Sequence, residues 1–141
     1  MKSYITVKAV FSAIFLLPFF VQASDVDCEN AMTTYAMNIC AAREMENANI
    51  ELAKYIAAVK EKYSSESGVV AALDKSQQAW LGYRESHCDA IYEIWSGGTI
   101  RGVMFGACML QLTKQRTHNI WSDYLASMDP DPNPAMLPEP Q

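Results

Sequence analysis

The spacing of four cysteines constrains the fold of this 141-residue chain more than any other feature. An even number of cysteines in a short chain is typical of an exported, disulfide-bonded domain, and four allow three pairings. Cys88 and Cys108 each lie ten residues from Gly98, so they would reach the same level in a helical hairpin that turns there. One continuous helix would hold Cys28 and Cys40 about 18 Å apart, whereas a lead-in that folds back would join them. The spacing favours Cys28–Cys40 and Cys88–Cys108.

Apolar residues recur at helical spacing in three stretches. These stretches cover about Thr34–Tyr63, Ser67–Trp95 and Ile100–Ser127. Thr33 or Thr34 can cap the first helix and Thr99 the third, because a threonine hydroxyl accepts hydrogen bonds from free helix N–H groups. The polar residues 64–68 and the pair Gly97-Gly98, which ends the second helix as glycine commonly does, are short connections, which make consecutive helices antiparallel neighbours. We predict an all-α fold, an antiparallel bundle of three main helices stapled by two disulfides.

The Cys88–Cys108 bond requires an unusually close pair of helices. Bonded cysteines have Cα atoms within about 7 Å, whereas helix axes commonly pack about 8–10 Å apart. Gly102, Gly106 and Ala107 are small enough to permit this approach.

The stretch Ser76–Cys88 is expected to form the central helix of the bundle. Gln77, Trp80 and Arg84 share a helix face with Cys88, because residues three and four apart are neighbours there. The apolar residues on the same stripe are Val69, Val70, Leu73, Ile91 and Trp95. Polar groups in a core need partners, so Arg84 should reach a carboxylate, a backbone carbonyl or a helix C-terminus. We interpret these three residues as structural core.

The start of the chain has the composition of a secretory signal peptide. Lys2 and Lys8 accompany the apolar run Val10–Val21, which is too short for a stable membrane span. The residues Val21-Gln22-Ala23 resemble a signal-peptidase site. We expect residues 1–23 to be removed on export to the periplasm or the medium, an uncleaved anchor helix being the alternative.

Residues 24–128 then form the helical domain, and residues 129–141 form a tail. Five of the six prolines lie in this last segment. Such a composition predicts a disordered or polyproline-like tail.

The chain is acidic, with a formal net charge of -5. Loss of Lys2 and Lys8 makes it -5 − 2 = -7. A charge of this sign argues against nucleic acid, whose phosphates need a basic surface. It suits a cationic partner; the alternative is an acidic surface that serves solubility alone.

The sequence offers no catalytic motif. His87 and His118 are the only histidines, and neither has neighbours that form a triad or a ligand set. No two cysteines have the spacing of a zinc knuckle, and no paired-carboxylate motif or phosphate-binding glycine loop occurs. We expect no catalytic residue, no metal site and no cofactor.

Several segments together resemble one family. Residues 76–88 read SQQAWLGYRESHC, which is similar to the AQxAWxxYRxxxC signature of the LprI-like lysozyme inhibitor domain. Gly97-Gly98-Thr99, Cys108 and the residues 112–116 resemble its GG[ST]…C…LTxxR half. Residues 37–41 resemble its MNxCA segment. The resemblance covers about 28–124, with Asn49 standing where the family often has an acid.

The resemblance implies an exported envelope protein that binds and inhibits a lysozyme or another wall hydrolase. The alternatives are an immunity factor against a secreted periplasmic toxin, or an envelope protein without inhibitory activity. A lysozyme-type cleft holds two carboxyl groups, and a slim protrusion with hydrogen-bond donors could fill it. The candidate target-binding residues are Ser96, Gly97, Gly98, Thr99 and Arg101. The alternative for this tip is a simple turn between helices.

Overall fold

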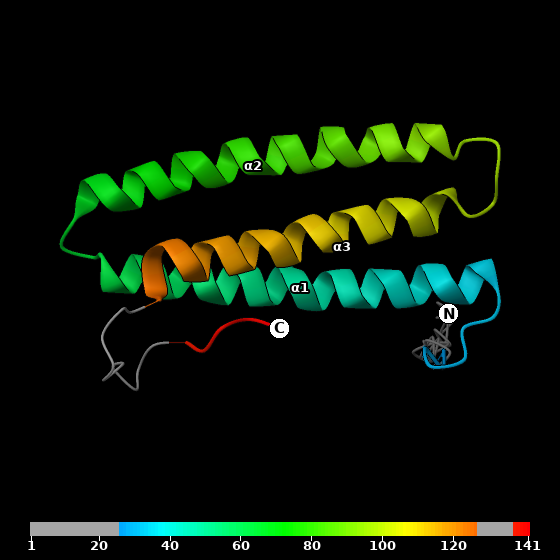
Figure 1. Ribbon diagram of the computed structural model, residues 1–141, viewed down its shortest axis with the longest axis horizontal. Helices are drawn as coiled ribbons and strands as arrows, with labels where there is room; N and C mark the ends of the chain where they lie inside the picture. Colours follow the sequence, from blue (N-terminus) through cyan, green and yellow to red (C-terminus); the bar gives the residue numbers. More distant parts are fainter. Residues whose placement is uncertain (1–25, 127–136) are drawn as a thin grey trace, which may run out of the picture.

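The computed structural model describes residues 26–126 and 137–141 and contains three long helices (Figure 1). They are α1 (Thr34–Lys62), α2 (Ser67–Ile94) and α3 (Arg101–Ile120), and α3 continues into one π-helical turn, η1 (Trp121–Leu125). The described residues contain no strand. The predicted all-α fold and three-helix bundle are therefore confirmed.

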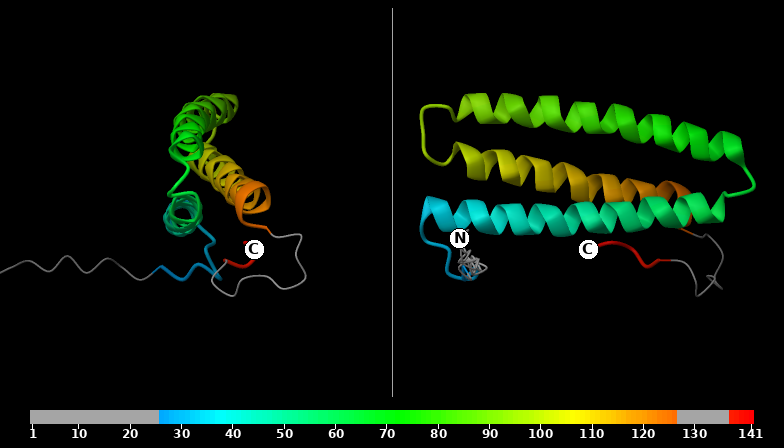
Figure 2. Two further views of the ribbon diagram at one scale, coloured as in Figure 1. Left: turned by 90° about the vertical axis from the view of Figure 1, so that its left-hand side faces the viewer. Right: turned by 180° about the vertical axis from the view of Figure 1, so that it is seen from behind.

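The central helix is α3, and not α2 as the sequence suggested. α3 packs against both α1 and α2, which contact each other far less, and Figure 2 shows α3 lying beside both. The side chains of α3 explain this position. Thr113 and Thr117 are completely buried, and each hydroxyl donates to a backbone carbonyl one turn earlier, at Met109 and Thr113. These small, internally satisfied residues let α3 be covered from two sides.

The two predicted disulfides are present. The Cα–Cα distance is 5.6 Å for Cys28–Cys40 and 5.7 Å for Cys88–Cys108. Two of the three small residues expected to admit the second bond, Gly102 and Gly106, serve a different contact. A Cβ at Gly102 would lie 2.6 Å from Asn38 Oδ1, and one at Gly106 would lie 3.1 Å from the Cβ of Ala41. These glycines therefore permit the close approach of α3 to α1, not to α2.

The helix ends agree with the sequence only in part. Thr33 caps α1, because its Oγ1 accepts a hydrogen bond from the Ala36 N–H at 3.1 Å. Thr99 does not cap α3, which begins after Ile100 without a side-chain cap. The α2 helix ends at Ile94, the N–H of its cap residue Trp95 bonds backbone carbonyls of the last turn, and no described glycine has a positive φ. Gly97 and Gly98 are thus not required there by a left-handed backbone.

The apolar core lies toward one end of the bundle. Its buried residues are Leu52, Tyr55, Val59, Leu73, Ile120 and Leu125. We call this end, with the 63–66 turn and η1, the core end. We call the opposite end, with the 95–100 turn and the start of α1, the tip end (Figure 1).

Residues 137–141, the last part of the tail expected to be disordered or polyproline-like, lie against the bundle. Leu137 packs against the core, and the Tyr55 hydroxyl donates a hydrogen bond to the Pro138 carbonyl at 2.7 Å. The contact of Leu137 was not predicted, because the segment was interpreted from its overall composition and not from its one leucine. The rest of the predicted tail and the predicted signal peptide lie outside the described residues. None of the helices described here combines the length and apolar character that a membrane span needs.

Candidate protein-binding site

The predicted tip residues are brought together at the tip end and are exposed. Ser96, Gly97, Gly98 and Thr99 form the turn, and Arg101 opens α3. Backbone bonds shape the turn, from Ser96 N to Glu93 O at 3.1 Å and from Gly98 N to Trp95 O at 3.0 Å. A side chain added at Gly97 would meet open space. The tip can therefore vary in size without disturbing the fold.

Arg101 is held against an aromatic side chain. Its guanidinium carbon lies 4.8 Å from the ring centroid of Tyr92 on α2, and this ring packs edge-on against Phe105 at 6.0 Å. A cation over a ring face is attracted by the ring quadrupole. Arg101 is thus held in place by contacts within the protein itself, and it remains exposed.

Three large apolar residues surround the turn. Ile94 is 73% exposed, Trp95 is 42% exposed and Ile100 is 38% exposed. The sequence placed Trp95 on the core stripe, and this was wrong. Trp95 stands just past the end of α2, where α3 has not yet begun and no facing helix covers the ring. Its place just before the Gly97-Gly98 turn is the sequence signal from which the exposure of Trp95 could have been predicted.

The start of α1 and the residues just before it add two more exposed apolar side chains to the tip end. Met32 is 85% exposed and Tyr35 is 70% exposed. Five of the eight large exposed hydrophobic residues in the described part of the chain therefore belong to one end of the bundle. Exposed apolar groups gathered in this way mark interaction surfaces more often than scattered ones do.

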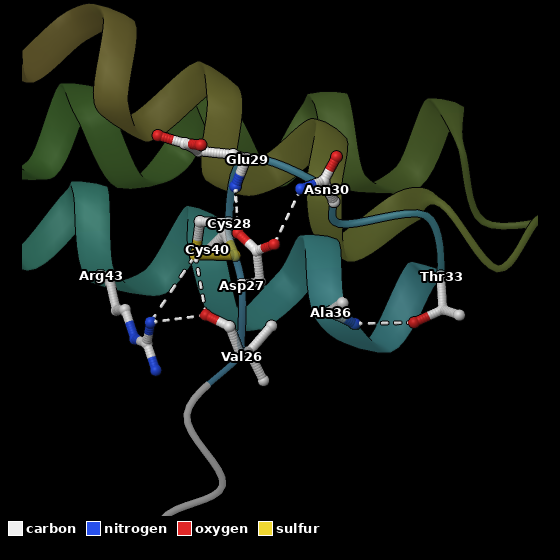
Figure 3. The surroundings of a disulfide bond; sticks show 9 residues. All are labelled: Val26, Asp27, Cys28, Glu29, Asn30, Thr33, Ala36, Cys40 and Arg43. Atoms are coloured by element: carbon white, nitrogen blue, oxygen red, sulfur yellow. Dashed lines mark hydrogen bonds between the residues drawn. A yellow bond between two sulfur atoms is a disulfide. The ribbon is translucent and has the colours of Figure 1, made fainter.

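The Cys28–Cys40 bond orders the lead-in to α1 (Figure 3). Arg43 Nη1 donates to the Val26 carbonyl at 3.0 Å. The Asp27 carboxylate accepts from the Asn30 side chain at 2.8 Å and from the Glu29 N–H at 3.0 Å. The Asn30 bond, and then the Glu29 bond, hold the pKa of Asp27 below its ordinary value. The lead-in is therefore fixed against α1 near the tip end.

Arg84 links all three helices in the middle of the bundle. Its Nη1 donates to Asn49 Oδ1 on α1 at 2.9 Å and to Thr113 Oγ1 on α3 at 2.7 Å. From the sequence, we expected Arg84 to bind a carboxylate, a backbone carbonyl or a helix C-terminus. This was wrong, because its partners are neutral side-chain oxygens. The guanidinium also stacks on Trp80, 4.7 Å from its ring centroid, while its buried Nε has no hydrogen-bond partner among the described residues. Burial lowers the pKa of Arg84, and the negative charge of Glu85 partly offsets this shift. The guanidinium stays charged, as arginine does in proteins.

Arg116 of α3 also reaches α2 beside Trp80. Its Nε donates to Gln77 Oε1 at 3.1 Å and its Nη2 to Ser76 Oγ at 2.8 Å. Its guanidinium carbon lies 5.9 Å from the Trp80 ring centroid. The predicted core residues Gln77, Trp80 and Arg84 therefore contact the bundle itself, as a structural role requires.

The described ranges show no further chemical centre. Within 26–126 and 137–141, no three His, Cys, Asp or Glu side chains gather in a way that could hold a metal ion. His87 is exposed and stacks on Tyr83, with ring centroids 5.4 Å apart. His118 lies on α3 beside Trp121.

A disulfide-stapled helical bundle with arginine, aromatic and aliphatic side chains displayed at one end has the character of a protein-binding domain. The chain belongs to the lysozyme inhibitor LprI family, whose model matches residues 27–120. That range includes all three helices and all four cysteines. A relative, an uncharacterized protein of Rhizobium meliloti (strain 1021), is 30% identical over 107 residues, covering 68% of this chain and 77% of the relative. No solved structure matches the chain.

Proposed function

We propose that this protein is an exported cell-envelope protein that inhibits a lysozyme or another wall-cleaving hydrolase by direct protein–protein contact. The observation that carries the proposal is the family match over 27–120, which spans the whole helical bundle. The family is one of inhibitors, so the protein is proposed to bind a target rather than to catalyse a reaction.

Export to the periplasm or the medium is part of the proposal. Two disulfides within one small domain suit an oxidising compartment. Residues 1–23 are proposed to be the signal peptide that directs this export, with Ser24 as the first residue of the mature chain.

The tip end is proposed to enter the cleft of the target hydrolase. Such a cleft presents two carboxyl groups, and an arginine can pair with a carboxylate through two parallel hydrogen bonds. Arg101 would supply that pair, and the hydroxyls of Ser96 and Thr99 would add donors. Trp95 and Ile100 would exclude water around the charge pair, which strengthens it.

The acidic charge of the rest of the protein supports a basic target. With the proposed signal peptide removed, the formal net charge is -5 − 2 = -7. Opposite net charges accelerate encounter and favour correct pairing. Arg101 at the tip would then be a local positive charge on an acidic protein, and it would fit an acidic cleft inside a basic enzyme.

The test is a lysis assay with purified protein beginning at Ser24. Lysozyme would be mixed with increasing inhibitor, and the clearing of a bacterial cell-wall suspension would be followed by turbidity. We expect the lysis rate to fall with inhibitor concentration and to recover at high salt, because salt weakens charge steering. An unchanged rate with lysozyme and with the wall hydrolases of the host cell would contradict the proposal.

A matched pair of glycine variants locates the binding surface. Gly97 at the tip end and Gly68 at the core end both face open space, so a larger side chain is tolerated at each. Gly97→Trp should abolish inhibition by blocking the cleft, whereas Gly68→Trp should leave it intact. Equal inhibition by the two folded variants would place the binding surface elsewhere.

A further inference from the structure

The segment 137–141 lies along the bundle near α1, and two aromatic side chains bind its backbone (Figure 1). The Tyr55 hydroxyl of α1 donates to the Pro138 carbonyl at 2.7 Å. The Trp121 Nε1 of η1 donates to the Leu137 carbonyl at 3.2 Å. Two successive carbonyls of a proline-containing segment are thus recognised from two different elements.

Side chains of the same segment make further contacts. Leu137 is half-buried and packs against the apolar core. His118 Nδ1 lies 3.5 Å from Glu139 Oε1, and the two form an ion pair when the histidine is protonated. The segment therefore has an apolar anchor, two backbone hydrogen bonds and a charged contact.

This combination is the chemistry by which proteins bind proline-rich peptides. A proline has no N–H group, so its segment forms no regular internal hydrogen bonds and leaves its carbonyls free to accept. Domains that bind such segments present aromatic side chains with hydrogen-bond donors in a shallow groove. Tyr55 and Trp121 supply those donors, and residues 137–140 read Leu-Pro-Glu-Pro.

We propose that the surface formed by Tyr55, His118 and Trp121 is a binding site for Leu-Pro-containing extended segments of a partner protein. Residues 137–141 are its intramolecular ligand, which the partner segment replaces. The two donors bind backbone carbonyls and so do not discriminate between one Leu-Pro segment and another. Tyr55 and Trp121 belong to the apolar core region and not to the 95–100 turn, and the proposal does not depend on lysozyme inhibition.

The surface has room for a segment longer than the intramolecular one. Gln141 lines a cavity of about 340 Å³ between α1 and α3, together with Glu51 and Lys114. A second, more apolar cavity of about 250 Å³ shares Glu44 and Leu110 with the first and continues to Ala31. A partner segment that extends into this apolar part would bury more surface than residues 137–141 do, and so could displace them.

The intramolecular ligand competes strongly because it is tethered. A ligand segment on the same chain binds at an effective concentration far above that of a dilute free peptide, so the wild-type site is occupied. The test therefore uses the full chain with Leu137→Asp, which removes the apolar anchor. The probe is a dye-labelled peptide with the sequence Leu-Pro-Glu-Pro-Gln, and binding is measured by fluorescence anisotropy. We expect this variant to bind the probe at least ten-fold more tightly than the wild type.

Controls assign the binding to the proposed surface. In the Leu137→Asp chain, Tyr55→Phe should weaken probe binding by about five-fold or more, because the donor to the carbonyl is lost. Tyr83→Phe, at an exposed tyrosine of α2, should leave it unchanged. A probe with both prolines replaced by alanine should bind more weakly. If Leu137→Asp perturbs folding by circular dichroism, Leu137→Ala provides the same test. Equal affinity of the probe for wild type and variant, or insensitivity to Tyr55→Phe, would overturn the proposal.

Discussion

The two ends of the bundle are held together by different means. At the core end, Leu73 of α2 and Ile120 of α3 are buried with residues of α1 in a continuous apolar cluster. At the tip end, both disulfides join the chain, and Ile94 and Trp95 remain exposed. Between the ends, the guanidinium groups of Arg84 and Arg116 both lie near the Trp80 ring.

The difference shows how a small domain can both fold and display apolar side chains. A bundle of this size has little apolar surface to bury, and disulfides commonly compensate in small exported domains. At the tip end, the Cys88–Cys108 bond joins α2 to α3, and Gly102 and Gly106 let α3 lie close to α1, outside the apolar core cluster. Large side chains at that end can therefore face outward, where a partner can contact them.

The largest expected effect comes from the core end. Leu73 is 1% exposed, and Leu73→Ala should lower the free energy of unfolding by about 2–5 kcal/mol through lost burial and the cavity left behind. Ile94→Ala at the tip end should change it by less than about 0.5 kcal/mol. Urea unfolding followed by circular dichroism measures both, and similar losses would erase the contrast between the ends.

The Cys88–Cys108 disulfide should contribute nearly as much to the free energy of unfolding. Closing a loop of 20 residues restrains the unfolded chain by about 3 kcal/mol on the entropy model. The double variant Cys88→Ala with Cys108→Ala should lose about this amount, little more than either single variant does. A Tm equal to that of the wild type in thermal unfolding would show that the tip end does not need the bond.

Two arginines stacked on rings provide a matched comparison of smaller size. Arg84 on Trp80 is half-buried, and Arg84→Leu should cost about 1–3 kcal/mol because two hydrogen bonds to the charged group are lost. Arg101 on Tyr92 is exposed, and Arg101→Leu should leave stability almost unchanged. We expect the opposite order for inhibition of the target. Loss of inhibition by a folded Arg84→Leu variant would contradict the structural role of that residue.

The smallest effect concerns pH. Burial, with a smaller contribution from Glu51, raises the pKa of Tyr55 above its ordinary value of 10.0. The unfolded chain therefore loses this proton first, so the contribution to stability is complete below about pH 10. It is lost as the pH rises through the higher pKa of the folded state. The stability of Tyr55→Phe, measured in urea from pH 8 to 11, should decline less over this range, and a decline as steep as that of the wild type would exclude Tyr55 as its source.

The sequence predicted the helices and the disulfides but not which helix is central. Helical periodicity places Leu73 and Arg84 on one face of α2, and the cysteine spacing about Gly98 requires a hairpin. Periodicity does not show which of three helices lies between the other two. That depends on the contacts of Gly102 and Gly106 with α1, which only the packed structure reveals.

The candidate site was predicted in part for a similar reason. The exposed turn Ser96–Thr99 and Arg101 could be chosen from residue type and position. Trp95 could not, because its exposure results from the offset between the end of α2 and the start of α3. The contact of Leu137 with the core also escaped prediction, because composition describes a segment on average and not its single apolar anchor.

The central claim is that the tip end binds the target through Arg101. The most direct measurement compares the inhibition of lysozyme by Arg101→Glu with that by Lys75→Glu, an equal change of charge at an exposed position near the core end of α2. The account predicts that Arg101→Glu raises the concentration needed for half inhibition by at least ten-fold, while Lys75→Glu shifts it by less than about three-fold. Equal inhibition by both folded variants, or a larger loss with Lys75→Glu, would contradict it.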